Sequence, residues 1–259
     1  MKNFVKKWLG GAEATTETIP PQAEPGHRVY GIGDIHGRLD LLQELHGMIE
    51  ADADPFDGER TVVYLGDCID RGMQSREVVE LLLDQPLAGF DNVYLVGNHE
   101  QTLLDFLAHP KAASGWLNWG GRETLLSYGL QAPMQVDRDQ VEDLRDAFLE
   151  VLPERHLEFY RAMQMMFVSG NYLFVHAGIR PGKALQEQSN EDLLWIRQDF
   201  TESRRQHDHV VVHGHTISDE VEFRPNRIGI DTGAYCTGVL TCLVVEGEQQ
   251  RLLQTGVVA

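Results

Sequence analysis

Apolar and polar positions follow the same order three times in the first half of the chain. A short, nearly continuous apolar run ends in a polar loop that contains glycine, and a stretch with apolar residues every three or four positions follows. The apolar run predicts a buried strand, and the spaced pattern predicts an amphipathic helix. The predicted strands are 28–32, 61–65 and 92–96, and the predicted helices are 39–49, 75–83 and 101–108.

Strands that alternate with helices about every 30 residues form βαβ units, so this part of the chain predicts a parallel sheet. Loops that leave the C-terminal ends of parallel strands gather at one edge of the sheet, where such sheets bind ligands. We therefore expect the loops 33–37, 66–72 and 97–100 to meet at one site.

The rest of the chain predicts a helical insertion and a second set of strands. Helical spacing dominates residues 107–163, with a break at Gly120 and Gly121, and we interpret this region as part of a single domain, 28–259. Residues 1–27 lack the apolar core of a signal peptide and predict a disordered extension; the alternative is a short basic surface anchor. The strands expected in the final third are 172–175, 210–213, 221–224, 227–230 and 239–246.

Composition narrows the class of protein and its partners. The 259 residues include 22 basic and 40 acidic ones, a net charge of −18, and 42% are hydrophobic, as in ordinary globular proteins. The negative charge repels polyanions, and no uncharged apolar run is long enough to cross a bilayer, so we expect neither a nucleic-acid partner nor stable membrane insertion. Three cysteines, an odd number, fit a reducing cytosol and predict a cytoplasmic protein.

Side chains that bind metals follow the predicted strands in five separate loops. A mixed set of carboxylate, amide and imidazole groups suits two divalent ions such as Mn²⁺, Fe²⁺ or Zn²⁺, whereas Ca²⁺ would require more oxygen ligands. The candidates are Asp34, His36, Asp67, Asn98, His176, and either His213 or His215.

The charge of such a site indicates a phosphorylated substrate. Two divalent ions bring about +4, and Asp34 and Asp67 remove about two charges, so the site keeps a positive charge of about +2. Arg71 and one further arginine would complete a socket for a phosphoryl dianion. Two ions can activate a shared water for in-line attack on phosphorus. His99 is then placed to protonate the leaving group, with Asp70 holding its imidazole.

Three motifs carry a resemblance to a known superfamily. Gly-Asp-Ile-His-Gly at 33–37, Gly-Asp-Cys-Ile-Asp-Arg-Gly at 66–72 and Gly-Asn-His-Glu at 97–100 resemble the signature of metallophosphoesterases. Within that superfamily they are most similar to PPP-type serine/threonine protein phosphatases of the bacterial and lambda-phage type. The resemblance covers about residues 28–246. It implies an α/β fold, an αββα sandwich of two mixed sheets flanked by helices, and two divalent metal ions, for which we expect Mn²⁺.

The resemblance also implies a role for each motif residue. For the pair at 213 and 215, it favours the histidine that follows the glycine. The residues implied to bind the metals are Asp34, His36, Asp67, Asn98, His176 and His215. Those implied to bind phosphate or donate the proton are Arg71, Arg197, His99 and Asp70.

A serine/threonine phosphatase acting on a phosphorylated protein or peptide is the leading hypothesis. A symmetrical diadenosine tetraphosphate hydrolase is the nearest alternative, but that branch usually lacks an aspartate at the position of Asp70 and reads Gly-Asn-His-Asp where this chain has Glu100. A broad phosphatase that also accepts phosphotyrosine is a further alternative. A non-catalytic metal-binding docking module is the last, and the presence of Asp70, Arg71 and His99 counts against it. Cys68 is expected to fill the core, and Asp231 and Tyr235 are secondary candidates.

Overall fold

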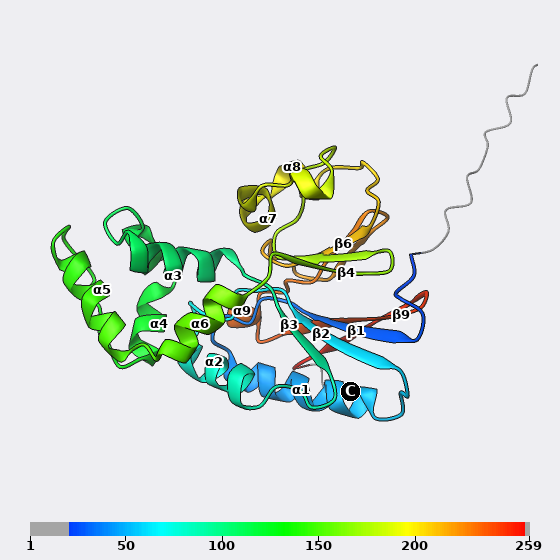
Figure 1. Cartoon of the computed structure of the whole chain (residues 1–259), viewed down its shortest axis with the longest axis horizontal. Helices are drawn as coiled ribbons and strands as arrows, with labels where there is room; N and C mark the ends of the chain where they lie inside the picture. The colour runs from blue at the N-terminus through cyan, green and yellow to red at the C-terminus, as the bar shows by residue number, and fades with distance from the viewer. Residues whose placement is uncertain (1–20, 257–259) are drawn as a thin grey trace, which may run out of the picture.

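Two mixed, five-stranded sheets pack face to face in the computed structural model, which describes residues 21–256 (Figure 1). The first sheet has the order β10 (Gln249–Gln254), β9 (Thr241–Glu246), β1 (His27–Ile32), β2 (Glu59–Tyr64) and β3 (Asp91–Tyr94). The second has the order β4 (Met166–Ser169), β5 (Tyr172–Val175), β6 (Val210–His213), β8 (Arg227–Gly229) and β7 (Glu222–Arg224). In each sheet three neighbouring strands are parallel, β1–β2–β3 and β5–β6–β8, and the others are antiparallel.

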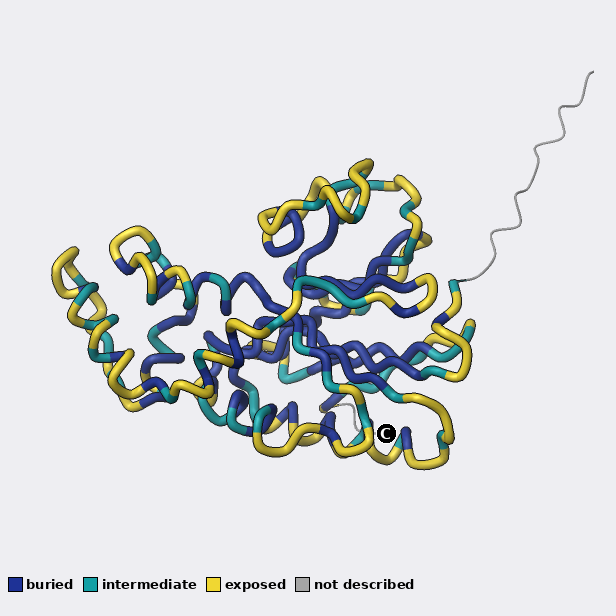
Figure 2. The backbone as a smooth tube through the Cα atoms, viewed as in Figure 1, coloured by how far each residue is buried: buried dark blue, intermediate teal, exposed yellow. Residues whose placement is uncertain are grey.

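The central strands are buried on both faces, which explains their nearly continuous apolar sequences. In β1, Val29 packs between the two sheets, and Tyr30 and Ile32 point to the opposite face. Gly31 allows the sheets to approach, because a Cβ there would lie 2.9 Å from the ring of Phe174. Figure 2 shows the buried chain concentrated in the sheets and in the loops beside them.

Helices cover the outer faces of the sandwich, as the resemblance implied. The first sheet is covered by α1 (Leu39–Ala53) and α2 (Ser75–Asp84), and the second by α7 (Asn190–Trp195) and α8 (Gln198–Thr201) (Figure 1). Short helical turns occur at η2 (Leu185–Glu187) and α9 (Ala234–Thr237).

The region predicted as a helical insertion, 107–163, lies with the helix predicted at 101–108 in a lobe at one end of the sandwich. We refer to it as the helical lobe; it comprises α3 (Asn98–Ala108), η1 (Ser114–Asn118), α4 (Gly121–Ser127), α5 (Gln140–Val151) and α6 (Glu154–Ala162) (Figure 1). Its first helix begins at Asn98, three residues earlier than the predicted 101–108, so the third motif loop is the first turn of α3. Glu100, in that turn, accepts a hydrogen bond from the amide of Gly97 at 2.9 Å, which stabilises the helix start.

Two further observations concern the N-terminal residues and the question of a membrane-spanning helix. The predicted extension, 1–27, falls mostly outside the described residues, but its last part packs on the domain: Ala23 is buried and its amide donates to the carbonyl of Gly247 at 2.9 Å. Within residues 21–256, no helix combines the length and apolar character needed to cross a membrane.

Candidate metal centre

The motif loops meet where parallel strands of both sheets end. The loops after β1 and β2 and the first turn of α3 come from the first sheet, and the loops after β5 and β6 come from the second. Their backbone is strained: the positive-φ residues other than glycine in the described chain are His36, Asp67, Asp70, Arg71 and His215. Left-handed conformations cost free energy for residues with a Cβ, and they concentrate at functional sites. The strained residues therefore all lie in loops that carry candidate metal ligands.

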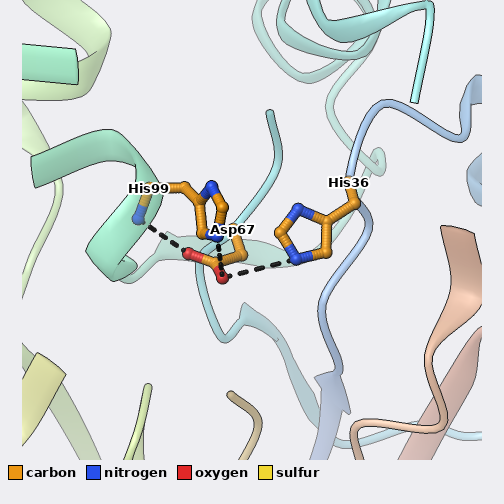
Figure 3. Close-up of side chains that lie close together, drawn as sticks. All are labelled: His36, Asp67 and His99. Atoms are coloured by element: carbon orange, nitrogen blue, oxygen red, sulfur yellow. Dashed lines mark hydrogen bonds and ion pairs between the residues drawn. The ribbon is translucent and has the colours of Figure 1, made fainter. Parts of the chain in front are cut away.

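Asp67 lies at the centre of the site. One carboxylate oxygen, Oδ2, lies 3.5 Å from Nε2 of His36 and 3.8 Å from Nε2 of His99 (Figure 3). The other, Oδ1, lies 3.5 Å from Nε2 of His176 and accepts the backbone amide of His99 at 3.1 Å. Two groups that could each hold a metal ion share this carboxylate: His36, Asp67 and His99, and Asp67, His176 and His215. A bridging carboxylate between two such groups suits a dinuclear centre.

The imidazoles leave lone pairs free for metal ions. Nδ1 of His36 and Nδ1 of His176 each lie 2.8 Å from a backbone carbonyl oxygen, which fixes the ring and directs Nε2 toward Asp67. Nε2 of His36 and Nε2 of His215 are buried and have no hydrogen-bond partner in the described chain. Burial lowers the pKa of His36 to about 3 and, together with His176, that of His215 to about 2, so both rings are neutral. These orphaned nitrogens fit bound metal ions.

Asn98 and Asp34 complete the donor set from two sides. Oδ1 of Asn98 lies 2.9 Å from Nε2 of His176 and 2.8 Å from Nδ1 of His215. Asp34 accepts the backbone amide of His215 at 3.0 Å, and a Cβ at Gly214 would lie 2.1 Å from Asp34 Oδ1, so glycine is required there. Burial, with Asp231 and Asp67 close by, raises the pKa of Asp34 well above its ordinary value. A bound cation would balance the negative charge of these neighbouring carboxylates.

His99 differs from the other histidines of the centre. Its Nδ1 lies 2.7 Å from Oδ2 of Asp70, and its Nε2 lies 3.3 Å from Nη2 of Arg71. Burial alone would lower the pKa of His99, but Asp67 and Asp70 outweigh it and raise this pKa to about 8. The ring is thus protonated at neutral pH and able to donate a proton.

Arg71 and Arg197 line a cavity of about 750 Å³ beside His99 and Asn98. Arg197 donates to the carbonyl of His215 at 3.3 Å, and the guanidinium of Arg71 stacks 4.7 Å above the ring of Tyr235. Neither arginine forms an ion pair within the described residues, so the positive charge of each is available to an anion in the cavity. The cavity is also lined by exposed rings, Trp119, Trp195 and Tyr235.

The structure separates the two histidines of the fifth loop. His215 lies in the group around Asp67, whereas His213 turns away and packs against Phe200, with Nε2 3.3 Å from Nη1 of Arg227. Burial lowers the pKa of His213 to about 4. The structure thus brings together Asp34, His36, Asp67, Asp70, Arg71, Asn98, His99, His176, Arg197 and His215.

Other residues of the site were not singled out by the sequence. The buried carboxylate of Glu100 accepts the backbone amides of Asp67 at 2.9 Å and of Cys68 at 2.7 Å, and so holds the second motif loop. Trp116 and Thr124 contact Asp70. Cys68 is buried in the core, as expected of a small filler, and burial raises the pKa of its thiol well above the ordinary value. The signal for Glu100 was its place within the third motif, not its residue type.

Comparisons with known proteins agree with this geometry. The model of the family described as calcineurin-like phosphoesterase matches residues 27–238. The chain is 28% identical over 238 residues to a bis(5'-nucleosyl)-tetraphosphatase PrpE [asymmetrical] of Anoxybacillus flavithermus, covering 82% of this chain and 88% of that protein. It is 26% identical over 222 residues to serine/threonine-protein phosphatase 2 of Salmonella typhimurium, covering 82% of this chain and 90% of that protein.

Solved structures share the fold. A putative diadenosine tetraphosphatase superposes with a TM-score of 0.60 at 20% identity, covering 90% of this chain and 98% of that one. A cold-active protein-tyrosine phosphatase of a psychrophile Shewanella sp. superposes with a TM-score of 0.53 at 18% identity, covering 90% and 83%. The resemblance carried by the motif loops is confirmed: the chain belongs to the calcineurin-like phosphoesterase family, and it is a metal-dependent phosphoesterase.

Proposed function

We propose that the protein hydrolyses phosphoserine and phosphothreonine in proteins or peptides. The observation that carries this proposal is the His99–Asp70 pair beside the two free arginines. A serine or threonine alkoxide is a strong base and must be protonated as the P–O bond breaks. A nucleotide that leaves through a phosphate oxygen is a much weaker base and gains little from a proton donor. A buried donor pair therefore supports an alkyl phosphomonoester as the substrate.

The proposed roles divide the site into three parts. The residues that would hold two divalent ions are Asp34, His36, Asp67, Asn98, His176 and His215. Such ions, when bound, would polarise the phosphoryl oxygens and lower the pKa of a water molecule, so that it could attack phosphorus as hydroxide near neutral pH. Arg71 and Arg197 bind the phosphoryl oxygens with their guanidinium forks. His99 donates a proton from Nε2 to the leaving oxygen, and Asp70 holds Nδ1.

Manganese and a cytoplasmic location belong to this proposal. The mixed oxygen and nitrogen ligand set suits Mn²⁺, with Fe²⁺ and Zn²⁺ as alternatives that elemental analysis of the purified protein distinguishes. The described chain has its three cysteines free, which supports a reducing compartment.

A dinucleoside tetraphosphatase is the second candidate, and one observation favours it. Trp119 and Trp195 are exposed beside the cavity, 49% and 37%, with ring centroids 5.9 Å apart. Exposed indoles next to Arg197 could stack on a nucleobase while the arginine binds phosphate. The relatives named bis(5'-nucleosyl)-tetraphosphatase are asymmetrical hydrolases by name, whereas the sequence suggested the symmetrical type as the alternative.

The test is phosphate release with Mn²⁺ from a phosphoserine peptide, from phosphotyrosine and from diadenosine tetraphosphate, each with and without EDTA. We expect EDTA-sensitive turnover with kcat/KM highest for the phosphoserine peptide. A preference for the dinucleotide, with nucleotide products identified by chromatography, would overturn the proposal in favour of the second candidate. Metal binding without turnover of any ester would indicate a docking module.

A further inference from the structure

Asp70 is held by three side-chain donors, one each from α3, η1 and α4 of the helical lobe. Its carboxylate is fully buried. Oδ2 accepts from Nδ1 of His99 at 2.7 Å and from the indole Nε1 of Trp116 at 2.8 Å, and Oδ1 accepts from Oγ1 of Thr124 at 2.5 Å. Among residues 21–256, no lysine or arginine forms an ion pair with this carboxylate. Two of its three side-chain donors therefore belong to η1 and α4.

Thr124 also fixes the backbone of the same loop. The amide of Asp70 donates to Oγ1 of Thr124 and to Oγ of Ser75, each at 3.0 Å. The loop and the helical lobe approach so closely that a Cβ at Gly120 would lie 2.4 Å from the backbone nitrogen of Arg71. Gly120 has a φ of 117°, which side chains rarely adopt. The strained loop at Asp70, with a φ of 72°, is thus braced from the lobe.

Trp116 is in turn held from behind. The side chain is fully buried, with ring centroids 4.9 Å from Phe106 of α3 and 6.2 Å from Phe148 of α5. A Cβ at Gly121 would lie 2.5 Å from the indole, so the chain lies directly against the ring. This packing leaves the indole one position, with its N–H directed at Asp70.

We propose that Trp116 and Thr124 are positioning residues of the proton donor. By fixing the Asp70 carboxylate they fix the imidazole of His99, so that Nε2 faces the cavity. This inference rests on the proposed function: a water oxygen forms a new bond to phosphorus as the P–O ester bond breaks, and the electron pair of that ester bond goes to the leaving oxygen, which takes the proton of Nε2. The attacking water releases a proton to solvent, and Nε2 regains one from solvent. The helical lobe, at one end of the sandwich, then takes part in leaving-group protonation.

The test compares two variants, Trp116→Phe and Thr124→Val, on esters with different leaving groups. Each variant removes one donor to the carboxylate. Thr124→Val keeps nearly the same volume and leaves Ser75 to accept the amide of Asp70, whereas Trp116→Phe keeps an aromatic ring but is smaller than the indole. We expect kcat to fall about tenfold on a phosphoserine peptide and less than about threefold on p-nitrophenyl phosphate, because the aryl oxide is a weak base. KM should stay unchanged, because neither side chain lines the cavity.

Tyr128→Phe is the matched control. Its buried hydroxyl also forms a hydrogen bond within the helical lobe, 2.7 Å from Nδ1 of His156, but does not touch Asp70. This variant should show no difference between the two leaving groups. Equal losses for the peptide and the aryl ester in Trp116→Phe and Thr124→Val, no loss in either, or the same selective loss in Tyr128→Phe, would overturn the inference.

A second readout does not depend on activity. In proton NMR of the metal-free protein, the hydrogen-bonded Nδ1 proton of His99 should give a downfield resonance, identified by its absence in His99→Asn. We expect this resonance to move upfield or broaden in Trp116→Phe and in Thr124→Val, and to stay in place in Tyr128→Phe. An unchanged resonance would refute the positioning role. A wild-type protein that does not hydrolyse the peptide would instead refute the proposed function, and the NMR comparison would still decide the inference.

Discussion

At the edges of the two sheets, two histidines that lie beside Asp67 have pKa values shifted in opposite directions. His99, from the first sheet and the helical lobe, is bonded to a carboxylate through Nδ1, and its pKa is raised to about 8. His215, from the second sheet, faces the amide of Asn98, and burial lowers its pKa to about 2. Both rings lie beside Asp67. Burial lowers the pKa of both rings. The carboxylates of Asp67 and Asp70 outweigh burial at His99, whereas His176 adds to its effect at His215, and this difference separates a proton donor from a neutral ligand.

Replacing Asp67, which both groups of metal-binding residues share, should disrupt both groups. We expect Asp67→Asn to lower kcat/KM by on the order of 10³-fold or more and to reduce the bound metal measured by elemental analysis. Asp105→Asn, which changes an exposed carboxylate on α3, is the control and should retain activity. Wild-type turnover in Asp67→Asn would contradict the dinuclear arrangement.

Replacing His99, the proposed proton donor, should affect protonation of the leaving group and leave the metal-binding residues in place. We expect His99→Asn to lower kcat by about 10²-fold on a phosphoserine peptide, and by far less on p-nitrophenyl phosphate, while metal content is retained. His109→Asn, an exposed histidine at the end of α3, should behave as wild type. Losses of equal size on both esters would mean that His99 does not act as a general acid.

The pH dependence should reveal the same difference. A pKa raised to about 8 means that His99 is protonated below that pH, so kcat for alkyl esters should fall as pH rises through 8. The raised pKa also stabilises the metal-free fold by about 2 kcal/mol below pH 6.5, and this contribution is lost as pH rises through 8. Denaturant unfolding at pH 6 and pH 9 measures it, and His99→Asn should reduce the pH dependence by about this amount, leaving the part that comes from Glu100, whose pKa burial raises to about 7. His215 should not add a second pH-dependent change between pH 6 and pH 9, because its pKa lies far below this range.

The smallest effect is expected at the rim of the cavity. Trp195→Ala removes an exposed ring that lines the cavity, with its centroid 6.2 Å from that of His215, and should raise KM about threefold with kcat nearly unchanged. Steady-state kinetics on the peptide and on diadenosine tetraphosphate would show which substrate uses the ring. A large loss of kcat would place Trp195 in the catalytic machinery instead.

Local patterns were sufficient for much of the fold. The strands predicted at 172–175 and 210–213 coincide with β5 and β6, because short apolar runs buried on both faces have clear limits. β4 and β10 were not predicted, since edge strands such as Gln249–Gln254 are half exposed and lack an apolar run. The early start of α3 was missed because its first turn carries functional polar residues, Asn98 and His99, in place of apolar spacing.

The site was predictable where a residue type carries its own chemistry. Asp, His and Asn at strand ends pointed to a metal centre. The contacts of Trp116 and Thr124 with Asp70 join residues 46 and 54 positions apart along the chain. No local pattern encodes such a contact, because buried tryptophan and threonine side chains are common in protein cores. Only the folded chain places these two against a carboxylate.

The left-handed backbone of the motif loops sets a limit on engineering this protein. Each such residue with a Cβ costs about 1–2 kcal/mol, so the five together cost an amount comparable with the net stability of a typical domain. Glycine at any of them would relieve that cost and remove a side chain of the centre. Heat tolerance and turnover are thus in conflict at these positions, and selection for heat tolerance alone should enrich substitutions in these loops.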